Sequence, residues 1–483
     1  MSRHFSPTRQ QQRRLGQARR ATALGLIIMG TLIAATVQPA IEHSFAAWTD
    51  TEWTHGSVGT DLMACGTDTG YSTTAAGKFL AATVAGVSLD SVVGINGLHA
   101  TRDGDTSAQV VPNSAHHPDA NDADTTTDTF TNPLTMSVLQ QGVLNLTGLT
   151  AGLPVGAAGV IGEYARVSNT GSSAGASGLL NNSGGVGFTP ATSRSQLPTA
   201  ASLNLASVLP AGVASTSLSV GAVAASAQLD WCAALESAIW GDGTVSGVHR
   251  DYEIASLGLV MQVPALKDVL ATATSTVSSF TNSVLKSEPE VVKAMALLAN
   301  PVIVADNMTV DLAQGTVSMN LASLLSAGIN DQAPNTALGL DTVKVAGAVA
   351  QVSTLVRTWT NAISTELQQA KSILSPLLTV LLDTLNTALD NLTNVLNSTV
   401  TALTPTLNEV FSALPRVLSL TVNVQPDQPN APAGTTVTPA FAASSAEYRV
   451  SALHILLLDY SAGTQLATAT FATGSAGVNV RLP

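Results

Sequence analysis

A stripe of leucine and valine residues between positions 374 and 414 constrains the fold of this 483-residue chain more than any other feature. Its members recur in steps of three and four: Leu374, Leu378, Leu381, Leu385, Leu389, Leu392, Leu396, Val400, Leu403, Leu407, Val410 and Leu414. Because this spacing places them all on one side of an α-helix, it predicts helix over most of residues 341–414. Pro376 and Pro405 are expected to interrupt or kink that helix.

The residues that flank the stripe are Thr, Asn and Ser, so the charged pairs that specify coiled-coil partners are missing. A helical hairpin that packs on itself or on a sheet is the favoured interpretation. The alternatives are self-association or binding of other surface proteins through this segment, and contact with a membrane. The shortage of basic residues argues against a membrane surface. A further helix is predicted over 263–287, after Pro264, so residues 264–414 form a helical insertion with a short strand segment near 301–325.

Period-two alternation of apolar residues predicts half-buried strands on both sides of this insertion. It occurs in residues 215–231, 251–264 and 416–426, and residues 446–460 and 464–474 have the pattern of a hairpin closed by Ser-Ala-Gly. Polar tracts rich in Gly, Ser and Asp, at 101–130 and 168–200, predict long surface loops.

The expected fold class is therefore α+β. A β-rich, sandwich-like antiparallel body is built from residues 47–263, and residues 415–483 supply C-terminal strands that complete it. The helical insertion lies between these two parts.

The N-terminus has the layout of a secretory signal. Residues 1–20 are basic and contain no acid, residues 21–41 are uncharged, and Ser44 and Ala46 suit a cleavage site. Residues 1–46 are therefore predicted to be a signal peptide, and the protein is predicted to be secreted or at the cell surface. The alternative is an uncleaved N-terminal anchor, which would be the chain's contact with the membrane.

Charge excludes one class of partner. Charged residues make up only 11% of the chain, and the net charge is −12. Residues 1–46 contribute +5, from six arginines and one glutamate, so the rest of the chain carries −17. An acidic body of this kind repels nucleic acid, so no nucleic-acid partner is expected.

Two cysteines and two tryptophans are candidates for structural roles. Cys65 and Cys232 are the only cysteines, and in an oxidising compartment one disulfide is expected, with two unpaired thiols as the alternative. Trp48 and Trp53 lie just after the predicted signal and are expected to fix the mature N-terminus to the body.

An acidic loop is the one candidate for a metal site. Asp119, Asp122, Asp124 and Asp128, with His116 and His117 nearby, could supply the hard oxygen ligands that Ca²⁺ prefers. The EF-hand pattern is absent, and a solvated acidic loop is the favoured interpretation. No other cofactor is expected.

Catalytic patterns are weak. Residues 171–175 fit GxSxG around Ser173, but such matches arise by chance in a Gly/Ser tract. Asp251 and Glu253 share one face of a predicted strand with no partner in view, and His454 is expected to be a packed histidine. No catalytic residue is therefore predicted.

Several motifs, in order, resemble the choice-of-anchor G family of surface proteins from high-GC Gram-positive bacteria. They are "AAWTDTEWTHG" (46–56), residues 65–100, "TNPLTMSVL" (131–139), "GEYARVSNTGSSAGASG" (162–178) and "RDYEIASLGL" (250–259). The resemblance spans most of the exported chain and implies a surface protein without catalytic residues. The C-terminal anchor that such proteins carry is not matched by "SAGVNVRLP" at residues 475–483.

The predicted function is that of an exported, non-enzymatic structural protein of the cell surface or extracellular matrix. The first alternative is an adhesin or ligand-binding module that uses the acidic loop, with calcium as its cofactor. The second is a secreted hydrolase, for which a converging triad or carboxylate pair would be required.

Overall fold

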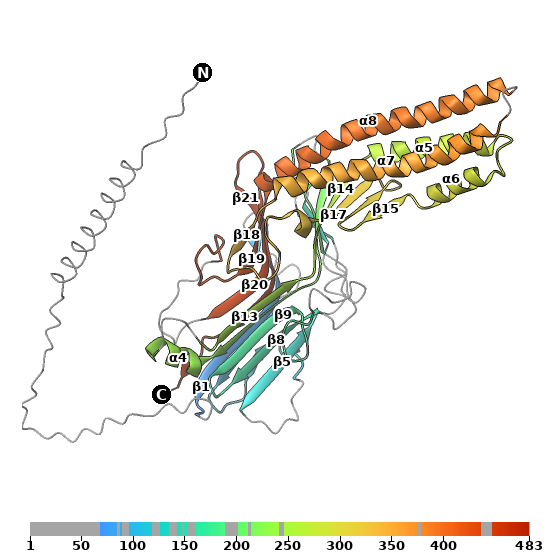
Figure 1. Ribbon diagram of the computed structural model, residues 1–483. Helices are drawn as coiled ribbons and strands as arrows, with labels where there is room; N and C mark the ends of the chain where they lie inside the picture. Colours follow the sequence, from blue (N-terminus) through green and yellow to red (C-terminus); the bar gives the residue numbers. More distant parts are fainter. Residues whose placement is uncertain are drawn as a thin grey trace, which may run out of the picture. The chain divides into compact units, whose positions relative to one another are not determined.

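A computed structural model describes twelve stretches of the chain (Figure 1). They are residues 68–84, 87–88, 96–117, 126–134, 143–146, 149–152, 161–188, 201–210, 214–240, 246–374, 378–435 and 447–482. The chain divides into two units, Met1–Leu62 and Met63–Pro483, and all of the described residues belong to the second. The predicted signal peptide, Trp48 and Trp53 lie outside them.

The largest sheet has nine antiparallel strands and contains both ends of the described chain. Along its main path the order is β18 (Thr336–Leu338), β19 (Leu418–Val424), β20 (Tyr448–Leu458), β21 (Gln465–Ala476), β1 (Tyr71–Val84), β3 (Leu98–Asp103) and β4 (Gln109–Val111). The short strands β2 (Val87–Ser88) and β22 (Val480–Arg481) also pair with β1. β20 and β21 form the hairpin predicted from the sequence.

A five-stranded antiparallel sheet packs face to face on the nine-stranded sheet. Its order is β13 (Val248–Ile254), β12 (Val223–Asp230), β9 (Ser172–Leu179), β8 (Ile161–Ser168) and β5 (Thr127–Pro133), and α4 (Trp231–Trp240) follows β12. β9 and β12 lie against β21, and β8 and β9 lie against β1. These two sheets form the sandwich-like body that the sequence predicted.

The two sheets of the sandwich touch at glycines. A Cβ atom added to Gly175 would lie 2.1 Å from the carbonyl oxygen of Ala76 and 2.2 Å from that of Ser475. One added to Gly77 would lie 2.1 Å from the carbonyl oxygen of Ala176. Packed sheets are normally about 10 Å apart because large side chains separate them. Here backbone meets backbone, and this close approach requires glycine.

Hydrogen bonds between buried polar groups cross the same sandwich. The hydroxyl of Ser177 lies 2.9 Å from the carbonyl oxygens of both Lys78 and Thr473. The side-chain nitrogen of Asn479 donates to the carbonyl of Gly171 over 2.9 Å. The body is therefore held together by small residues and polar contacts as well as by apolar burial.

A third sheet has eight antiparallel strands. Its order is β15 (Val302–Ala305), β16 (Met308–Asp311), β17 (Thr316–Asn320), β14 (Leu257–Gln262), β11 (Thr216–Val220), β10 (Ala201–Asn204), β7 (Leu149–Gly152) and β6 (Val143–Leu146). The strand segment expected near 301–325 thus corresponds to β15, β16 and β17. β17 pairs with β14, and β15 is the end strand of the sheet.

The strand predicted over residues 215–231 is in fact two strands in two sheets. β11 ends at Val220 in the eight-stranded sheet, and β12 begins at Val223 in the five-stranded sheet. The neighbouring strands β13 and β14 change sheets beside them, and the amide of Gly221 donates to the carbonyl of Ser256 over 2.9 Å. Alternation did not reveal the break because Leu218 and Val220 before it and Ala222 and Ala224 after it are all buried, the first two in one hydrophobic cluster and the other two in another.

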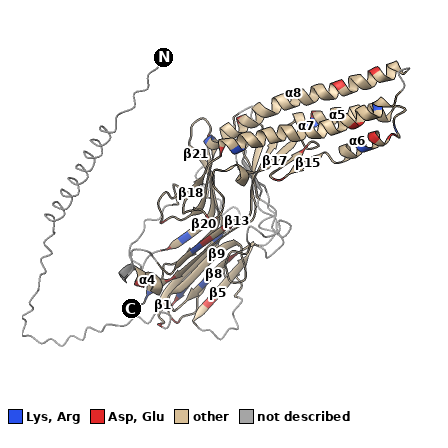
Figure 2. Ribbon diagram, in the orientation of Figure 1, with Lys and Arg blue, Asp and Glu red and all other residues tan. Residues whose placement is uncertain are grey.

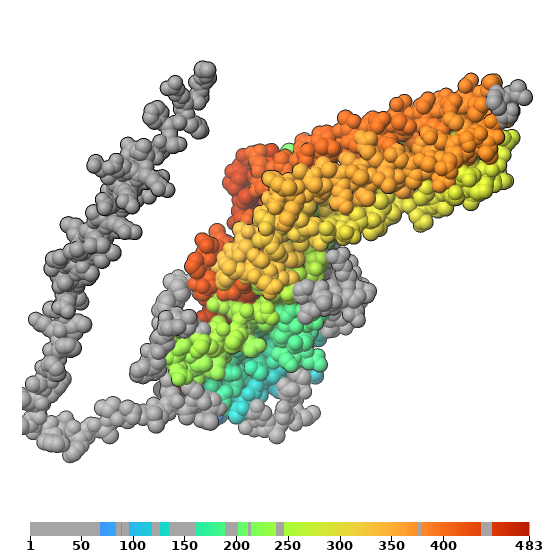
Figure 3. All heavy atoms as spheres, viewed as in Figure 1, coloured from blue at the N-terminus to red at the C-terminus, as the bar shows by residue number. Residues whose placement is uncertain are grey.

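Four helices pack with the eight-stranded sheet. They are α5 (Ala265–Thr281), α6 (Pro289–Ala299), α7 (Thr342–Ser372) and α8 (Thr379–Val417), and a 3-10 turn, η2, covers Leu321–Leu324. α7 and α8 form the predicted helical hairpin and lie side by side in Figure 3. α8 also contacts α5. The leucine–valine stripe is buried from Leu385 to Leu414.

Of the two outcomes expected at Pro405, an interruption or a kink, the interruption is wrong, because α8 continues through this residue. Proline deprives the carbonyl four residues earlier, on Thr401, of its helical partner. Pro405 and Thr401 both lie on the exposed side of α8, so water can satisfy that carbonyl. Pro376 lies outside the described residues.

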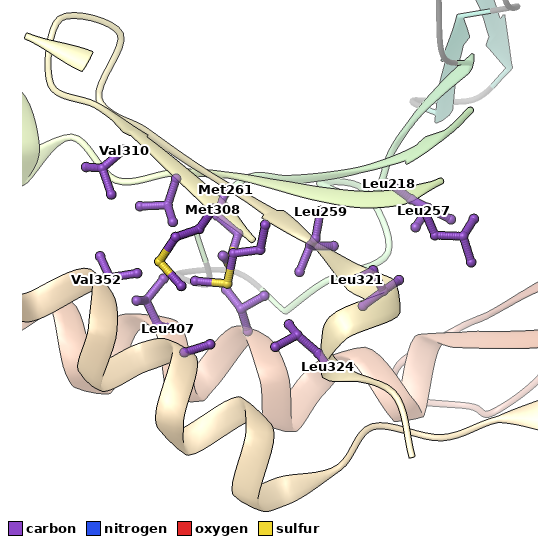
Figure 4. Packing of buried hydrophobic residues seen from close by; sticks show 14 of the residues in the cluster. Leu218, Leu257, Leu259, Met261, Met308, Val310, Leu321, Leu324, Val352 and Leu407 are labelled. Carbon is purple, nitrogen blue, oxygen red and sulfur yellow. The ribbon is translucent and has the colours of Figure 1, made fainter. Parts of the chain in front are cut away.

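The helices cover one face of the eight-stranded sheet (Figure 4). Met261 from β14 and Met308 from β16 point towards Val352 of α7 and Leu407 of α8. All four side chains are buried. The opposite face carries half-buried hydroxyl and amide side chains, among them Ser217, Ser219, Thr309, Ser318 and Asn320.

Candidate functional site

The acidic loop is described only in part. Asp119, Asp122 and Asp124 lie outside the described residues, whereas Asp128 lies in β5. Its Oδ2 accepts from Nη1 of the buried Arg102 over 2.7 Å, and its Oδ1 lies 3.2 Å from Nε2 of His117. Both carboxylate oxygens of Asp128 therefore have protein partners. The calcium prediction now rests on the other three aspartates and stays a prediction.

Three carboxylates gather beside β13. Asp251 and Glu253 lie on one face of that strand, as the sequence indicated, and Asp331 joins them from the segment before β18. Burial and the nearby charges of Asp331 and Asp251 raise the pKa of Glu253 to about 7. Sequence reasoning missed Asp331, because nothing local links it to a strand about 80 positions earlier.

Asn330 holds this cluster to the strand. Its side-chain nitrogen donates to Oε1 of Glu253, and its Oδ1 accepts from the amide of Ile254 over 2.9 Å. No group of three or more His, Cys, Asp or Glu side chains in the described part of the chain has an arrangement that could hold a metal ion. Glu253 is therefore a carboxyl whose pKa lies near neutral pH and which accepts a hydrogen bond from Asn330 inside the protein.

Arg250 makes a two-point ion pair beside this cluster. Its guanidinium contacts both carboxylate oxygens of Asp427, with Nη2 and Oδ2 2.8 Å apart, and lies over the ring of Tyr448. Burial alone would raise the pKa of Asp427, but the hydrogen bonds and charge of Arg250 outweigh it and hold that pKa below its usual range. The pair fastens β13 to the segment after β19.

Only one of the two cysteines, Cys232, lies among the described residues. Cys232 is 2% exposed and lies in a small cluster with Tyr71 and Trp231 at the start of α4. Oδ1 of Asp230 accepts from the amide of Cys232 over 3.0 Å and so caps the helix. Cys65 lies outside the described residues, so the disulfide stays a prediction.

Two residues that the sequence offered for catalysis, Ser173 and His454, are buried in the protein. Ser173 is buried in β9, and its hydroxyl lies 2.9 Å from Nδ2 of Asn479. A nucleophile elbow needs a strand-to-helix turn, which β9 does not provide here. His454 is buried, its Nδ1 lies 2.9 Å from Oγ1 of Thr470, and burial lowers its pKa. The interpretation of His454 as a packed histidine is confirmed.

Exposed apolar side chains concentrate on the helical segment and its strands. Among the described residues, twelve large hydrophobic side chains are exposed, and nine lie between positions 284 and 380. These nine are Val284, Val292, Met295, Val302, Val304, Val343, Ile373, Leu378 and Val380. The side chain of Val380 is 80% exposed and that of Val304 is 73% exposed. They are distributed along α6 and the segment before it, β15, both ends of α7 and the start of α8, and we call these nine side chains the apolar arm surface.

The rest of this region is mostly polar, with acidic and basic residues scattered along its helices (Figure 2). A groove of about 770 Å³ between α5 and α8 is lined only by Ala, Val, Ser, Thr and Asn side chains. The hydroxyl of Thr276 in this groove lies 3.2 Å from the carbonyl of Ala388 on the opposite helix. An apolar cavity of about 180 Å³ lies between η2, β18, β19 and the end of α8. In the sequence, the feature that pointed to the uncharged groove was the use of Thr, Asn and Ser, rather than Glu and Lys, beside the leucine–valine stripe.

In the part of the chain that the structure describes, none of the helices combines the length and the apolar character needed to span a membrane.

Comparison with known proteins gives one match. A family model described as a domain of unknown function (DUF8394) matches residues 75–299, 287–373 and 370–477, which together include α5, α6, α7, α8 and every described strand except β22 and the first four residues of β1. No curated protein matches the chain, and no solved structure matches it. Because the three matched segments cover most of the chain, the protein belongs to the family defined by this domain of unknown function (DUF8394).

Proposed function

We propose that this chain is an exported structural protein of the bacterial cell surface or extracellular matrix, and that it works by association rather than by catalysis. The observation that carries the proposal is the apolar arm surface, which holds nine of the twelve exposed large hydrophobic side chains found among the described residues. A surface of this kind favours contact with another macromolecule, because covering it removes apolar area from water.

Three sequence features support the exported location. They are the signal-like residues 1–46, the low content of charged residues and the resemblance to choice-of-anchor G surface proteins. The acidic charge of the rest of the chain is compatible with a protein partner and unfavourable for nucleic acid.

Fractionation of cells that produce the full chain tests the location. The protein is expected in the wall, surface or culture-medium fraction, and recovery in the cytoplasm would overturn the proposal.

Surface retention tests the role of the apolar arm surface. The double variant Ile373→Asn, Val380→Asn removes two exposed side chains of that surface and is expected to weaken retention in the surface fraction. Val111→Asn is the matched control, because Val111 is 61% exposed but lies on β4, outside the helical segment. Equal retention of the double variant and the control would remove the arm surface from the proposal.

A further inference from the structure

β15 is the last strand of the eight-stranded sheet. The sequence along its outer edge indicates which partner could pair with it. It reads Val-Ile-Val-Ala over residues 302–305, with no charge and no proline within it. Natural edge strands are usually blunted by charges, prolines or bulges, because their free backbone groups recruit other strands. β15 has none of these between Val302 and Ala305.

The backbone groups of two valines point outwards from this edge. The amide of Leu312 donates to the carbonyl of Pro301 over 3.0 Å, and hydrogen-bonded and non-hydrogen-bonded pairs alternate along an antiparallel ladder. Ile303 and Ala305 therefore bond to β16, whereas the N–H and C=O groups of Val302 and Val304 face away from it. Among the described residues, no hydrogen bond to these four groups is found.

The side chains of the same two valines are exposed. Val302 is 46% exposed and Val304 is 73% exposed, whereas Ile303 and Ala305 pack towards the hydrophobic core. Val292 and Met295 add exposed apolar area on α6, which ends two residues before β15 begins. The edge therefore offers both unpaired backbone groups and apolar side chains.

We propose that β15 pairs with β15 of a second copy of this chain, antiparallel and centred on Ile303. This inference rests on the proposed function, because it names the partner that covers part of the apolar arm surface. The pattern of the strand is self-complementary about Ile303. Val302 of one copy lies opposite Val304 of the other, so the outward N–H and C=O groups of both residues form four hydrogen bonds.

The flanking residues agree with this register. With Ile303 at the two-fold axis, Asn300 of one copy lies opposite Asp306 of the other, so no like charges face each other. The two exposed Val302–Val304 pairs stack β-branched side chains on one face of the joined sheet. A second copy thus pairs the free backbone groups of β15, places apolar side chains beside one another and brings no like charges together.

The register can be tested by cross-linking of the full chain. Ile303→Cys places two thiols opposite each other in a non-hydrogen-bonded pair, where the Cα atoms lie about 4.5 Å apart and a disulfide can form. Val302→Cys is the matched control, because its thiol would face Val304 of the other copy. Under mild oxidation, Ile303→Cys is expected to give a covalent dimer that a reductant dissolves, and Val302→Cys is not. Equal dimer from both variants, or from neither, would overturn the register.

The role of the edge is tested by the solution mass of the full chain at concentrations up to about 100 µM. The wild type is expected to form dimers, and Val304→Pro is expected to shift it to monomer. Proline at this position removes an outward N–H while leaving every hydrogen bond to β16 in place. Val111→Lys, on the edge strand β4 of another sheet, should leave the dimer intact.

Val304→Lys serves as a second edge variant and is also expected to be monomeric, which covers the case in which Val304→Pro fails to fold. A monomeric wild type, or a dimer that survives both Val304 variants, would overturn the β15 pairing. If fractionation still finds the protein at the surface, those outcomes overturn only the β15 pairing and leave the proposed function intact. If fractionation finds the protein in the cytoplasm, the proposed function is overturned, whether the protein is a monomer or a dimer.

Discussion

The ring of Tyr71 lies against the ring of Trp231, with the centroids 5.1 Å apart and the planes inclined at 55°. This contact joins the first residue of β1 to the first residue of α4, and Cys232 follows directly. Cys65 precedes Tyr71 by six residues in the sequence, and six residues span at most about 20 Å, which is compatible with the predicted pairing of Cys65 with Cys232.

We expect the two cysteines to be paired in the exported protein. Cys232→Ser should lower the free energy of unfolding by about 2–4 kcal/mol, because the bond limits the freedom of the unfolded chain. Denaturant unfolding measures the loss. Cys65→Ser and the double variant should lose the same amount, since all three lack the same bond. If an alkylating reagent labels both cysteines of the unfolded, unreduced wild type, the pairing is refuted.

Replacement of Gly175 by alanine should destabilise the sandwich by about 1–3 kcal/mol or more, because the added methyl meets two carbonyl oxygens of the facing sheet. Gly347→Ala is the control, since an added methyl there meets nothing within 4 Å and lies in the helix α7. It should stabilise the protein by about 1 kcal/mol, because alanine favours helix over glycine. Thermal unfolding of the two variants should shift in opposite directions. Equal shifts would show that the sheets can move apart at Gly175.

The pKa of Glu253, raised to about 7 in the folded protein, makes stability depend on pH. A raised carboxyl pKa means that the folded state holds the proton more tightly than the unfolded state. This contribution is complete below the pKa of the unfolded chain, near 4.5, and is lost as the pH rises through 7. Glu253→Gln removes the charge and retains an oxygen that can accept from Asn330.

The Glu253→Gln variant should therefore match the wild type at pH 4.5 and exceed it at pH 8 by about 1 kcal/mol, because the carboxyl is partly exposed to water. Urea unfolding at the two pH values gives the comparison. Asp331→Asn should shrink the difference, because it removes a charge that raises the pKa. A Glu253→Gln variant that is less stable than the wild type at pH 8 would contradict this account.

Pro405→Ala should stabilise α8 by about 1–3 kcal/mol, because it restores a helical N–H for the carbonyl of Thr401 at an exposed position. Thermal unfolding is the measurement. Thr404→Ala, one residue earlier and also exposed, should change stability by less than about 0.5 kcal/mol. A loss of stability in Pro405→Ala would mean that the proline fits a bend that the helix needs.

Calcium at millimolar concentration should leave the unfolding temperature unchanged, because both oxygens of Asp128 already have protein partners. Calorimetry of a calcium titration measures any heat of binding. A calcium-dependent rise in the unfolding temperature that the triple variant Asp119→Asn, Asp122→Asn, Asp124→Asn abolishes would instead support the calcium-dependent adhesin.

The sequence by itself determined the features that depend on local spacing. The stripe from Leu385 to Leu414 predicted α8, and Leu257, Leu259 and Met261 predicted the buried face of β14, because period and burial follow directly from backbone geometry. The hairpin of β20 and β21 was readable for the same reason.

Only the tertiary structure decided how distant segments meet. The change of sheet at Gly221, the contact of Gly175 with Ala76 and the approach of Asp331 to Glu253 all join residues that share no local pattern. Alternation records which side of a strand is buried and leaves open which sheet buries it. The free backbone groups of Val302 and Val304 are likewise decided by their place on the last strand of a sheet, because in a central strand the same groups would bond to a second neighbouring strand.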